Sequence, residues 1–202
     1  MKYWYSAAIF PPVYFVHGRF NSGGTVSEDG IILGVEKLKD LEGLPSLVAH
    51  ELIHFQQKIE IPEAQYTLLD GVIMEGSADF IGELISGQNI NSEAFKFGEQ
   101  HQDKLAMEFV VSMEKQEGKD WLYEVSGKDE RPNDLGYWMG YKITKSYFDK
   151  AEDKKRAIEE ILKFKNAQHF LEEGNFLYPY IQNVEKMTDA EKEKLLNPFS
   201  KK

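Results

Sequence analysis

The chain has 202 residues, of which 24 are Lys or Arg and 34 are Asp or Glu, so its formal net charge at pH 7 is −10. This acidic balance argues against a nucleic-acid-binding protein, because phosphate contacts need clustered basic side chains. The chain has no cysteine, which excludes disulfides, thiol nucleophiles and cysteine-based zinc sites, so any transition-metal site must use the five histidines and carboxylates.

The first ten residues are mostly apolar behind Lys2, a pattern shared with signal peptides. Pro11 and Pro12 interrupt the apolar run, and no small-x-small cleavage motif follows before Arg19. No stretch reaches the roughly 20 apolar residues that a membrane helix requires. We therefore expect one domain over residues 1–202 without a signal peptide or membrane span, compatible with the core of a longer exported or lipid-anchored precursor.

Short strands are expected near the N-terminus, at residues 13–16, 25–27 and 31–35, where β-branched and aromatic residues are frequent. Turn residues at 21–24 and 28–30 separate these strands. From about residue 44 onward the apolar periodicity is helical. Helices are expected at about 45–58, 63–86, 92–117, 134–150, 152–165 and 189–196, with Gly87 ending the second and a polar loop at 126–133. This order predicts an α+β fold, β-rich over about 1–36 and helical over about 44–202.

The first expected helix contains the pattern His50-Glu51-Leu52-Ile53-His54. Residues four apart lie on one helical face, so both imidazoles can reach one metal ion. Glu51 lies beside the pair, where a base acting on metal-bound water would have to be. The alternative is a pair of buried histidines satisfied by hydrogen bonds, so a third ligand is the decisive check.

The next expected helix offers that third ligand in Glu75, with Asp79 one turn further on. Catalytic zinc takes three protein ligands and leaves one position open, so Glu75 can complete the site. Asp79 can then hydrogen-bond the outer nitrogen of a ligating histidine and fix its tautomer. The alternative is a solvated acidic stripe, which Glu83 would continue.

Four segments together resemble a known family: 18–27 (GRFNSGGTVS), 50–57 (HELIHFQQ), 75–80 (EGSADF) and 135–141 (LGYWMGY). They resemble the predicted Zn-dependent protease family DUF2268, which is similar to proteins related to the gliding-motility lipoprotein GldB. The metal motif is that of the gluzincins, the thermolysin-like branch of zinc metalloproteases. The resemblance covers about residues 14–147 and implies a zincin-like fold. It also implies one zinc ion held by His50, His54 and Glu75, with Glu51 as general base.

A zinc peptidase also needs a donor for the tetrahedral oxyanion. Zinc lowers the pKa of bound water towards about 7, and Glu51 would take the proton and pass it to the leaving amine. Tyr137 and Tyr141 share a helical face and are the candidate oxyanion donors, although aromatic stripes at this spacing are also typical of a core. Arg131 and His101 are further candidates, with a surface position as the alternative.

The glycine-rich stretch around Gly23, Gly24 and Thr25 has two interpretations. It can be a hairpin turn in which the glycines adopt positive φ. It can also be part of an extended strand that binds a peptide substrate by strand addition. His17 and His169 have no partner at ligand spacing and are expected to be structural.

Together these patterns predict a zinc-dependent hydrolase, expected to be a metallopeptidase that acts on a peptide or protein. One alternative keeps the chemistry but takes a non-peptide amide or ester. The other is a catalytically silent binding or assembly protein that retains the metal site as a relic or a ligand-sensing pocket. The intact Glu51 argues against a relic, because such a site has no need of the base. The sequence does not indicate specificity, oligomeric state or compartment.

Overall fold

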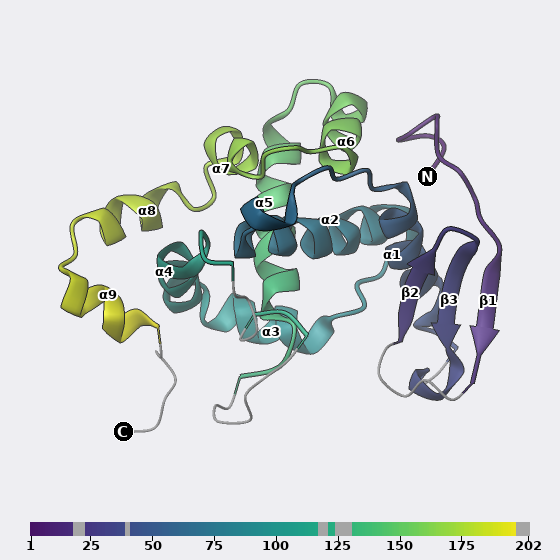
Figure 1. Ribbon diagram of the computed structural model, residues 1–202, viewed down its shortest axis with the longest axis horizontal. Helices are drawn as coiled ribbons and strands as arrows, with labels where there is room; N and C mark the ends of the chain where they lie inside the picture. The colour runs from purple at the N-terminus through teal and green to yellow at the C-terminus, as the bar shows by residue number, and fades with distance from the viewer. Residues whose placement is uncertain (18–22, 39–40, 117–120, 124–130, 197–202) are drawn as a thin grey trace.

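The computed structural model describes residues 1–17, 23–38, 41–116, 121–123 and 131–196 (Figure 1). Within these residues, a small three-stranded sheet precedes a body built of helices. The predicted α+β class is therefore confirmed. In Figure 1 the sheet lies at one side of the helical body, next to helices α1 and α2.

The sheet consists of β1 (Val13–Val16), β2 (Gly24–Ser27) and β3 (Gly30–Gly34) in the order β1-β3-β2. Strand β3 is central, pairing in parallel with β1 and antiparallel with β2. Its side chains Ile31 and Leu33 are buried and form a small apolar cluster with Leu52 of α1. The sheet thus packs onto the helix that carries the His50-x-x-x-His54 pair, and β2 forms the edge beside it.

The turn that needs a glycine lies between β2 and β3. Gly30 has φ 151°, and a Cβ there would lie 2.4 Å from the carbonyl oxygen of Pro12. Among the described residues, the glycines with positive φ are Gly30 and Gly87. The interpretation of Gly23 and Gly24 as a positive-φ turn is therefore wrong, since Gly24 begins strand β2. Residues 21 and 22 of that predicted turn lie outside the described residues.

Helices α1 (Leu44–Gln56) and α2 (Leu68–Ser86) contain the predicted metal ligands. The expected start of the second helix at residue 63 is wrong, because residues 63–65 form the short 3-10 helix η2 (Glu63–Gln65). Helix α2 begins after Thr67, whose side chain and that of Asp70 form a capping box. It ends as predicted at Gly87, whose φ of 82° places it in the left-handed region.

The single helix expected over residues 92–117 is instead two helices, α3 (Ser92–Gln100) and α4 (Gln102–Ser112). They meet at His101, whose φ of −122° and ψ of 20° are not helical. The His101 ring lies against Phe97, with ring centroids 4.3 Å apart. The sequence periodicity continues across this junction, so it did not reveal the break.

The remaining helices are α5 (Leu135–Lys150), α6 (Lys154–Leu162), α7 (Gln168–Gly174), α8 (Tyr178–Glu185) and α9 (Asp189–Leu195). Helices α5, α6 and α9 match predicted segments, although α6 is shorter at both ends than the expected 152–165. Helices α7 and α8 were not predicted. Each is only two turns long, and Asn175 between them adopts a left-handed conformation that interrupts the periodicity.

Helices α2 and α5 cross with their backbones in direct contact. A Cβ on Gly76 would lie 2.2 Å from the Tyr141 amide nitrogen, and one on Gly140 would lie 1.8 Å from the Val72 carbonyl oxygen. The small residues that follow Glu75 therefore bring α2 close to α5. On the side of α2 that faces α1, the close approach is at Gly82, near the backbone of His50. This crossing fixes α2, and with it Glu75, in the middle of the body.

The first ten residues pack against the helices. Tyr5 and Ala8 are buried in the main core. The side-chain amide of Gln56 accepts a hydrogen bond from the Ile9 amide and donates one to the Ile9 carbonyl oxygen, each at 2.8 Å. Across the described part of the chain, no helix combines the length and the apolar character needed to cross a membrane.

Candidate metal centre

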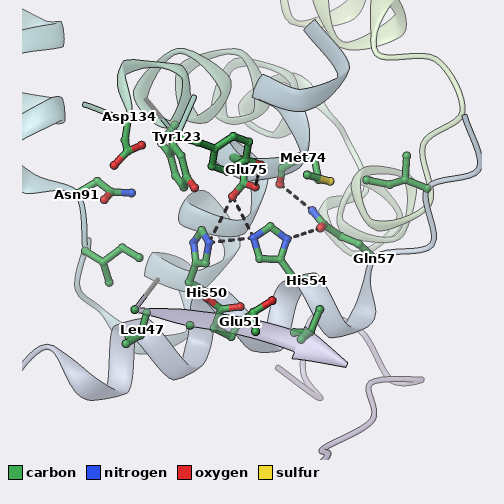
Figure 2. A pocket seen from close by; sticks show the side chains of 17 residues that line it. Leu47, His50, Glu51, His54, Gln57, Met74, Glu75, Asn91, Tyr123 and Asp134 are labelled. Carbon is green, nitrogen blue, oxygen red and sulfur yellow. Dashed lines mark hydrogen bonds and ion pairs between the residues drawn. The ribbon is translucent and has the colours of Figure 1, made fainter. Parts of the chain in front are cut away.

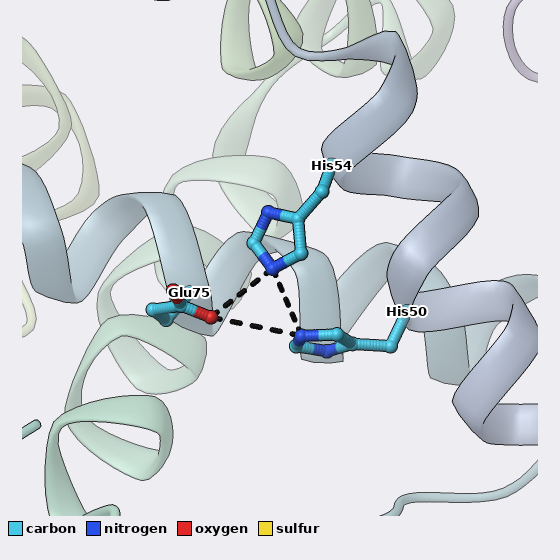
Figure 3. Close-up of side chains that lie close together, drawn as sticks. All are labelled: His50, His54 and Glu75. Carbon is cyan, nitrogen blue, oxygen red and sulfur yellow. Dashed lines mark hydrogen bonds and ion pairs between the residues drawn. The ribbon is translucent and has the colours of Figure 1, made fainter. Parts of the chain in front are cut away.

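Three potential ligand atoms converge between α1 and α2 (Figure 3). The Nε2 atoms of His50 and His54 are 2.9 Å apart, and the Glu75 Oε2 atom lies 3.1 Å from that of His54 and 3.6 Å from that of His50. Ligand atoms at about 2.0–2.1 Å from a tetrahedral zinc ion are about 3.3 Å from one another. The observed separations bracket that value.

Each of these three side chains is held from outside by a second residue. The Nδ1 atom of His50 lies 2.7 Å from Asp79 Oδ1, and the Nδ1 atom of His54 lies 2.7 Å from Gln57 Oε1. The hydroxyl of Tyr123 donates to Glu75 Oε1 at 2.5 Å. Such outer contacts orient metal ligands and set the tautomer of ligating histidines.

The hydrogen bonds around Gln57 define the proton on His54. The Gln57 amide nitrogen donates to the Met74 carbonyl oxygen at 2.8 Å and to Ser77 Oγ at 3.1 Å, so its Oε1 atom faces His54. The Nδ1 atom of His54 must then carry a proton. The carboxylate of Asp79 requires the same of His50 Nδ1. The two Nε2 atoms are therefore the nitrogens left to face the Glu75 carboxylate, and a cation, either a metal ion or a proton, is needed among the three atoms.

The protonation equilibria reflect the same need for positive charge. Burial alone would lower the pKa of His50, but the contacts with Asp79 and Glu75 outweigh burial and raise this pKa to about 10. Burial would raise the pKa of Glu75, but hydrogen bonds to both histidines lower it well below its usual value. In the metal-free protein a proton on His50 thus takes the place of a metal cation. The donor set fits a divalent ion such as zinc.

Glu51 lies beside the ligands and packs against strand β2. Its side chain is buried, and a Cβ on Gly24 would lie 2.4 Å from Glu51 Oε1. Gly24 thus allows β2 to approach this carboxylate closely. Burial raises the pKa of Glu51, while the neighbouring His50 and His54 act to lower it. A carboxyl group with a raised pKa is suited to accept and return a proton near neutral pH.

The ligand atoms open onto a pocket of about 600 Å³ (Figure 2). Asn91, Tyr123 and Asp134 lie at one end of the view, and Gln57 and Met74 lie at the other. The described lining contains the carboxylates of Glu51, Glu75 and Asp134 and no lysine or arginine. Its residues are Gly23, Gly24, Thr25, Val26, Leu47, His50, Glu51, His54, Gln57, Ile59, Met74, Glu75, Ile90, Asn91, Tyr123, Asp134 and Tyr137.

Three tyrosines around the site, Tyr137, Tyr141 and Tyr123, take different positions. Tyr137 lines the pocket and stacks on His50, with ring centroids 5.9 Å apart. Tyr141 lies outside the pocket lining, where its ring packs edge-on against Phe80 and Phe95. The structure thus brings Tyr137 to the predicted centre but not Tyr141. Tyr123, which the sequence did not suggest, also lines the pocket.

The other candidate residues lie away from the described pocket lining. Arg131 is buried rather than on the surface, and its guanidinium contacts Glu108 at 2.8 Å. His101 occupies the junction of α3 and α4. His17 and His169 are exposed and belong to neither the ligand group nor the pocket lining.

Several residues around the centre were missed by the sequence reasoning. Gln57 follows His54 by three residues, so helical spacing could have identified it as a partner. Asn91, which donates to Asp79 Oδ2 at 2.7 Å, gave no such signal. Tyr123 and Asp134 lie far along the chain, and tertiary structure alone brings them to the pocket.

The fold and the centre define a class of protein: an α+β chain with a His/His/Glu group that can hold one metal ion. A family model described as "Predicted Zn-dependent protease (DUF2268)" matches residues 16–172, most of the chain. The protein therefore belongs to this family. No curated protein and no solved structure matches the chain.

Proposed function

We propose that the protein is a zinc metallopeptidase of zincin-like fold and gluzincin type. His50, His54 and Glu75 would hold one zinc ion, and Asp79 would fix the His50 tautomer. The observation that carries this proposal is the convergence of two imidazole nitrogens and a carboxylate oxygen at one pocket, with buried Glu51 beside them. Family membership supports the choice of metal and reaction class.

The base of the reaction is Glu51. Zinc supplies a Lewis acid that polarises a carbonyl group and makes water a stronger acid when it is bound. The Glu51 carboxylate accepts the proton of the attacking water and returns it to the leaving amine. Its buried position and raised pKa suit both steps, because the carboxyl group must be deprotonated first and protonated afterwards.

The substrate would lie along strand β2. In the described sheet β2 is an edge strand, and residues Gly23, Gly24 and Thr25 line the pocket next to Glu51. A peptide can pair with such an edge through backbone hydrogen bonds, which bind an extended chain without regard to most of its side chains. This arrangement favours a peptide or protein over a small amide or ester as substrate.

Tyr137 is the proposed donor to the developing oxyanion. Burial, together with the nearby Glu75 carboxylate, raises the pKa of its phenol, so the hydroxyl stays protonated and able to donate. Donors of this kind stabilise the transition state where water is excluded. Tyr141 has no part in this proposal, because it lies outside the pocket lining.

The test compares the zinc-loaded protein with zinc-loaded Glu51→Gln in a cleavage profile of a peptide library. The variant should keep its zinc, because Glu51 is not in the ligand group. Its rate of cleavage should be at least about 100-fold lower. Glu63→Gln, in exposed η2, is the matched control and should cleave like the unmodified protein. Equal cleavage by both variants, or no cleavage by the zinc-loaded unmodified protein, would contradict the proposal.

A further inference from the structure

Tyr123 contacts the metal centre from outside the two ligand helices. Its hydroxyl donates to Glu75 Oε1, the oxygen opposite the one that faces the histidines. A carboxylate bound through one oxygen can rotate about its side-chain torsions unless the second oxygen is held. The hydrogen bond from Tyr123 therefore fixes which way Glu75 Oε2 points.

The residues before Tyr123 are fixed against the core. Trp121 and Leu122 are buried, and the Gly136 amide donates to the Trp121 carbonyl oxygen at 2.9 Å. Gly136 also lets α5 approach this segment, because a Cβ there would lie 2.7 Å from Leu122 Cδ2. Tyr123 itself has φ 67°, a conformation that L-residues rarely adopt. The phenol of Tyr123 thus extends towards Glu75 from a backbone that the buried residues Trp121 and Leu122 hold in place.

Tyr123 differs from the other two outer contacts in its origin and exposure. Asp79 and Gln57 lie on or next to the helices that carry the ligands, and the Asp79 side chain is fully buried. Tyr123 comes from a segment between α4 and α5, and 63% of its surface is exposed. Although most of the side chain is exposed, its hydroxyl end lines the pocket beside Glu75, where partial desolvation and the carboxylate raise the pKa of the phenol, so the hydroxyl remains a donor at neutral pH.

We propose that Tyr123 is a positioning residue of the metal centre, which strengthens metal binding by orienting Glu75. A donor to the outer atom of a ligating group typically changes metal affinity by about 10- to 100-fold. The inference rests on the metal centre of the proposed function but not on peptidase activity. The proposal adds to the metal centre a residue outside α1 and α2, because Tyr123 lies between α4 and α5 and lines the pocket.

The test is the zinc affinity of Tyr123→Phe, measured by competition with a chromophoric chelator on the full chain. Phenylalanine keeps the ring and removes only the hydroxyl, and we expect zinc to bind about 10- to 100-fold more weakly. The visible absorption spectrum of the cobalt(II)-substituted variant should also change, because that spectrum reports the ligand geometry. Loss of packing alone would not alter it.

Tyr66→Phe is the matched control. Tyr66 is a partly buried phenol close enough to Glu75 for that carboxylate to raise its pKa, but its hydroxyl contacts the Met74 sulfur at 3.7 Å instead of a ligand. Its removal should leave zinc affinity and the cobalt spectrum unchanged. Unchanged affinity in Tyr123→Phe, or an equal loss in both variants, would overturn the role of Tyr123 while leaving the metal centre intact. Failure of the unmodified protein to bind zinc would overturn both.

Discussion

The pocket has two walls of different construction. One wall is helical: α1 and α2 carry the three potential ligands, and Asp79 and Gln57 hold the two histidines from the same region. The rest of the described lining, here called the facing wall, includes residues of β2 together with Tyr123 and Asp134. The helical wall defines which cation the site can hold. In the proposed function, the facing wall would define how a substrate and the base Glu51 meet that cation.

This difference predicts that substitutions in the helical wall act on metal binding and stability. Substitutions in the facing wall should act on catalysis while the metal stays bound. The two walls touch where the sheet packs onto α1, where Gly24 meets the Glu51 side chain and where Tyr123 meets Glu75. Each prediction below separates the two walls or shows where they are coupled.

The largest effect is expected for His54→Ala in the helical wall. This substitution leaves two of the three ligand atoms. We expect that zinc no longer co-purifies with the protein and that the protein no longer competes with a chelator for zinc, because catalytic zinc needs three protein ligands. Metal analysis of the purified protein checks this. His169→Ala, which removes an exposed histidine of α7, should retain a full equivalent of zinc. Retention of zinc by His54→Ala would show that the zinc binds at another place in the protein.

The next contrast uses a glycine of α5 that packs against the helical wall from behind and a glycine of the facing wall. Gly140→Ala would place a Cβ 1.8 Å from the Val72 carbonyl oxygen. Because neither backbone can yield, we expect the α2–α5 crossing to open and the free energy of unfolding to fall by about 3 kcal/mol. Urea unfolding measures this loss.

Gly24→Ala in the facing wall should behave differently. The new Cβ would meet the end of the Glu51 side chain, which can move, rather than backbone. We expect a free energy of unfolding close to that of the unmodified protein, full zinc binding and impaired cleavage, because Glu51 is displaced. A loss of zinc in Gly24→Ala would show that the walls are not separable at this point.

The same two walls explain how far the sequence could predict the site. The ligands and Asp79 lie at helical spacings within two continuous helices, so periodicity and residue type alone brought them together. Tyr123 belongs to no helix, and its contact with Glu75 depends on the burial of Trp121 and Leu122. The sequence carries no periodic signal for such a contact.

Helix ends were predicted from local sequence signals such as glycine and proline. They were missed where no such residue marks the end. The capped end of α2 at Gly87 was predictable from one residue, since glycine readily takes the left-handed conformation. The break at His101 was not, because no glycine or proline marks it. Tyr141 shows the converse: its spacing from Tyr137 is helical, but Phe80 and Phe95 hold its ring outside the pocket lining.

The last comparison is the pH dependence of the metal-free protein, which comes from the helical wall. His50 has a usual pKa of 6.5 and a pKa of about 10 in the folded protein. Its stabilising contribution is complete below pH 6.5 and is lost as the pH rises towards about 10. The lowered pKa of Glu75 acts in the opposite sense, since its contribution is complete above its usual value of 4.5 and is lost as the pH falls.

Thermal unfolding with a chelator present should therefore show a midpoint that is highest between about pH 4.5 and 6.5 and falls towards pH 10. With zinc bound, the nitrogen that faces the metal has no proton to lose, so the alkaline decline should disappear. Because these partners all lie on α1 and α2, Gly24→Ala should show the same alkaline decline as the unmodified protein. A metal-free midpoint that stays constant from pH 6.5 to 10 would contradict the proton-for-metal exchange at His50, and a decline altered by Gly24→Ala would place part of the control in the facing wall.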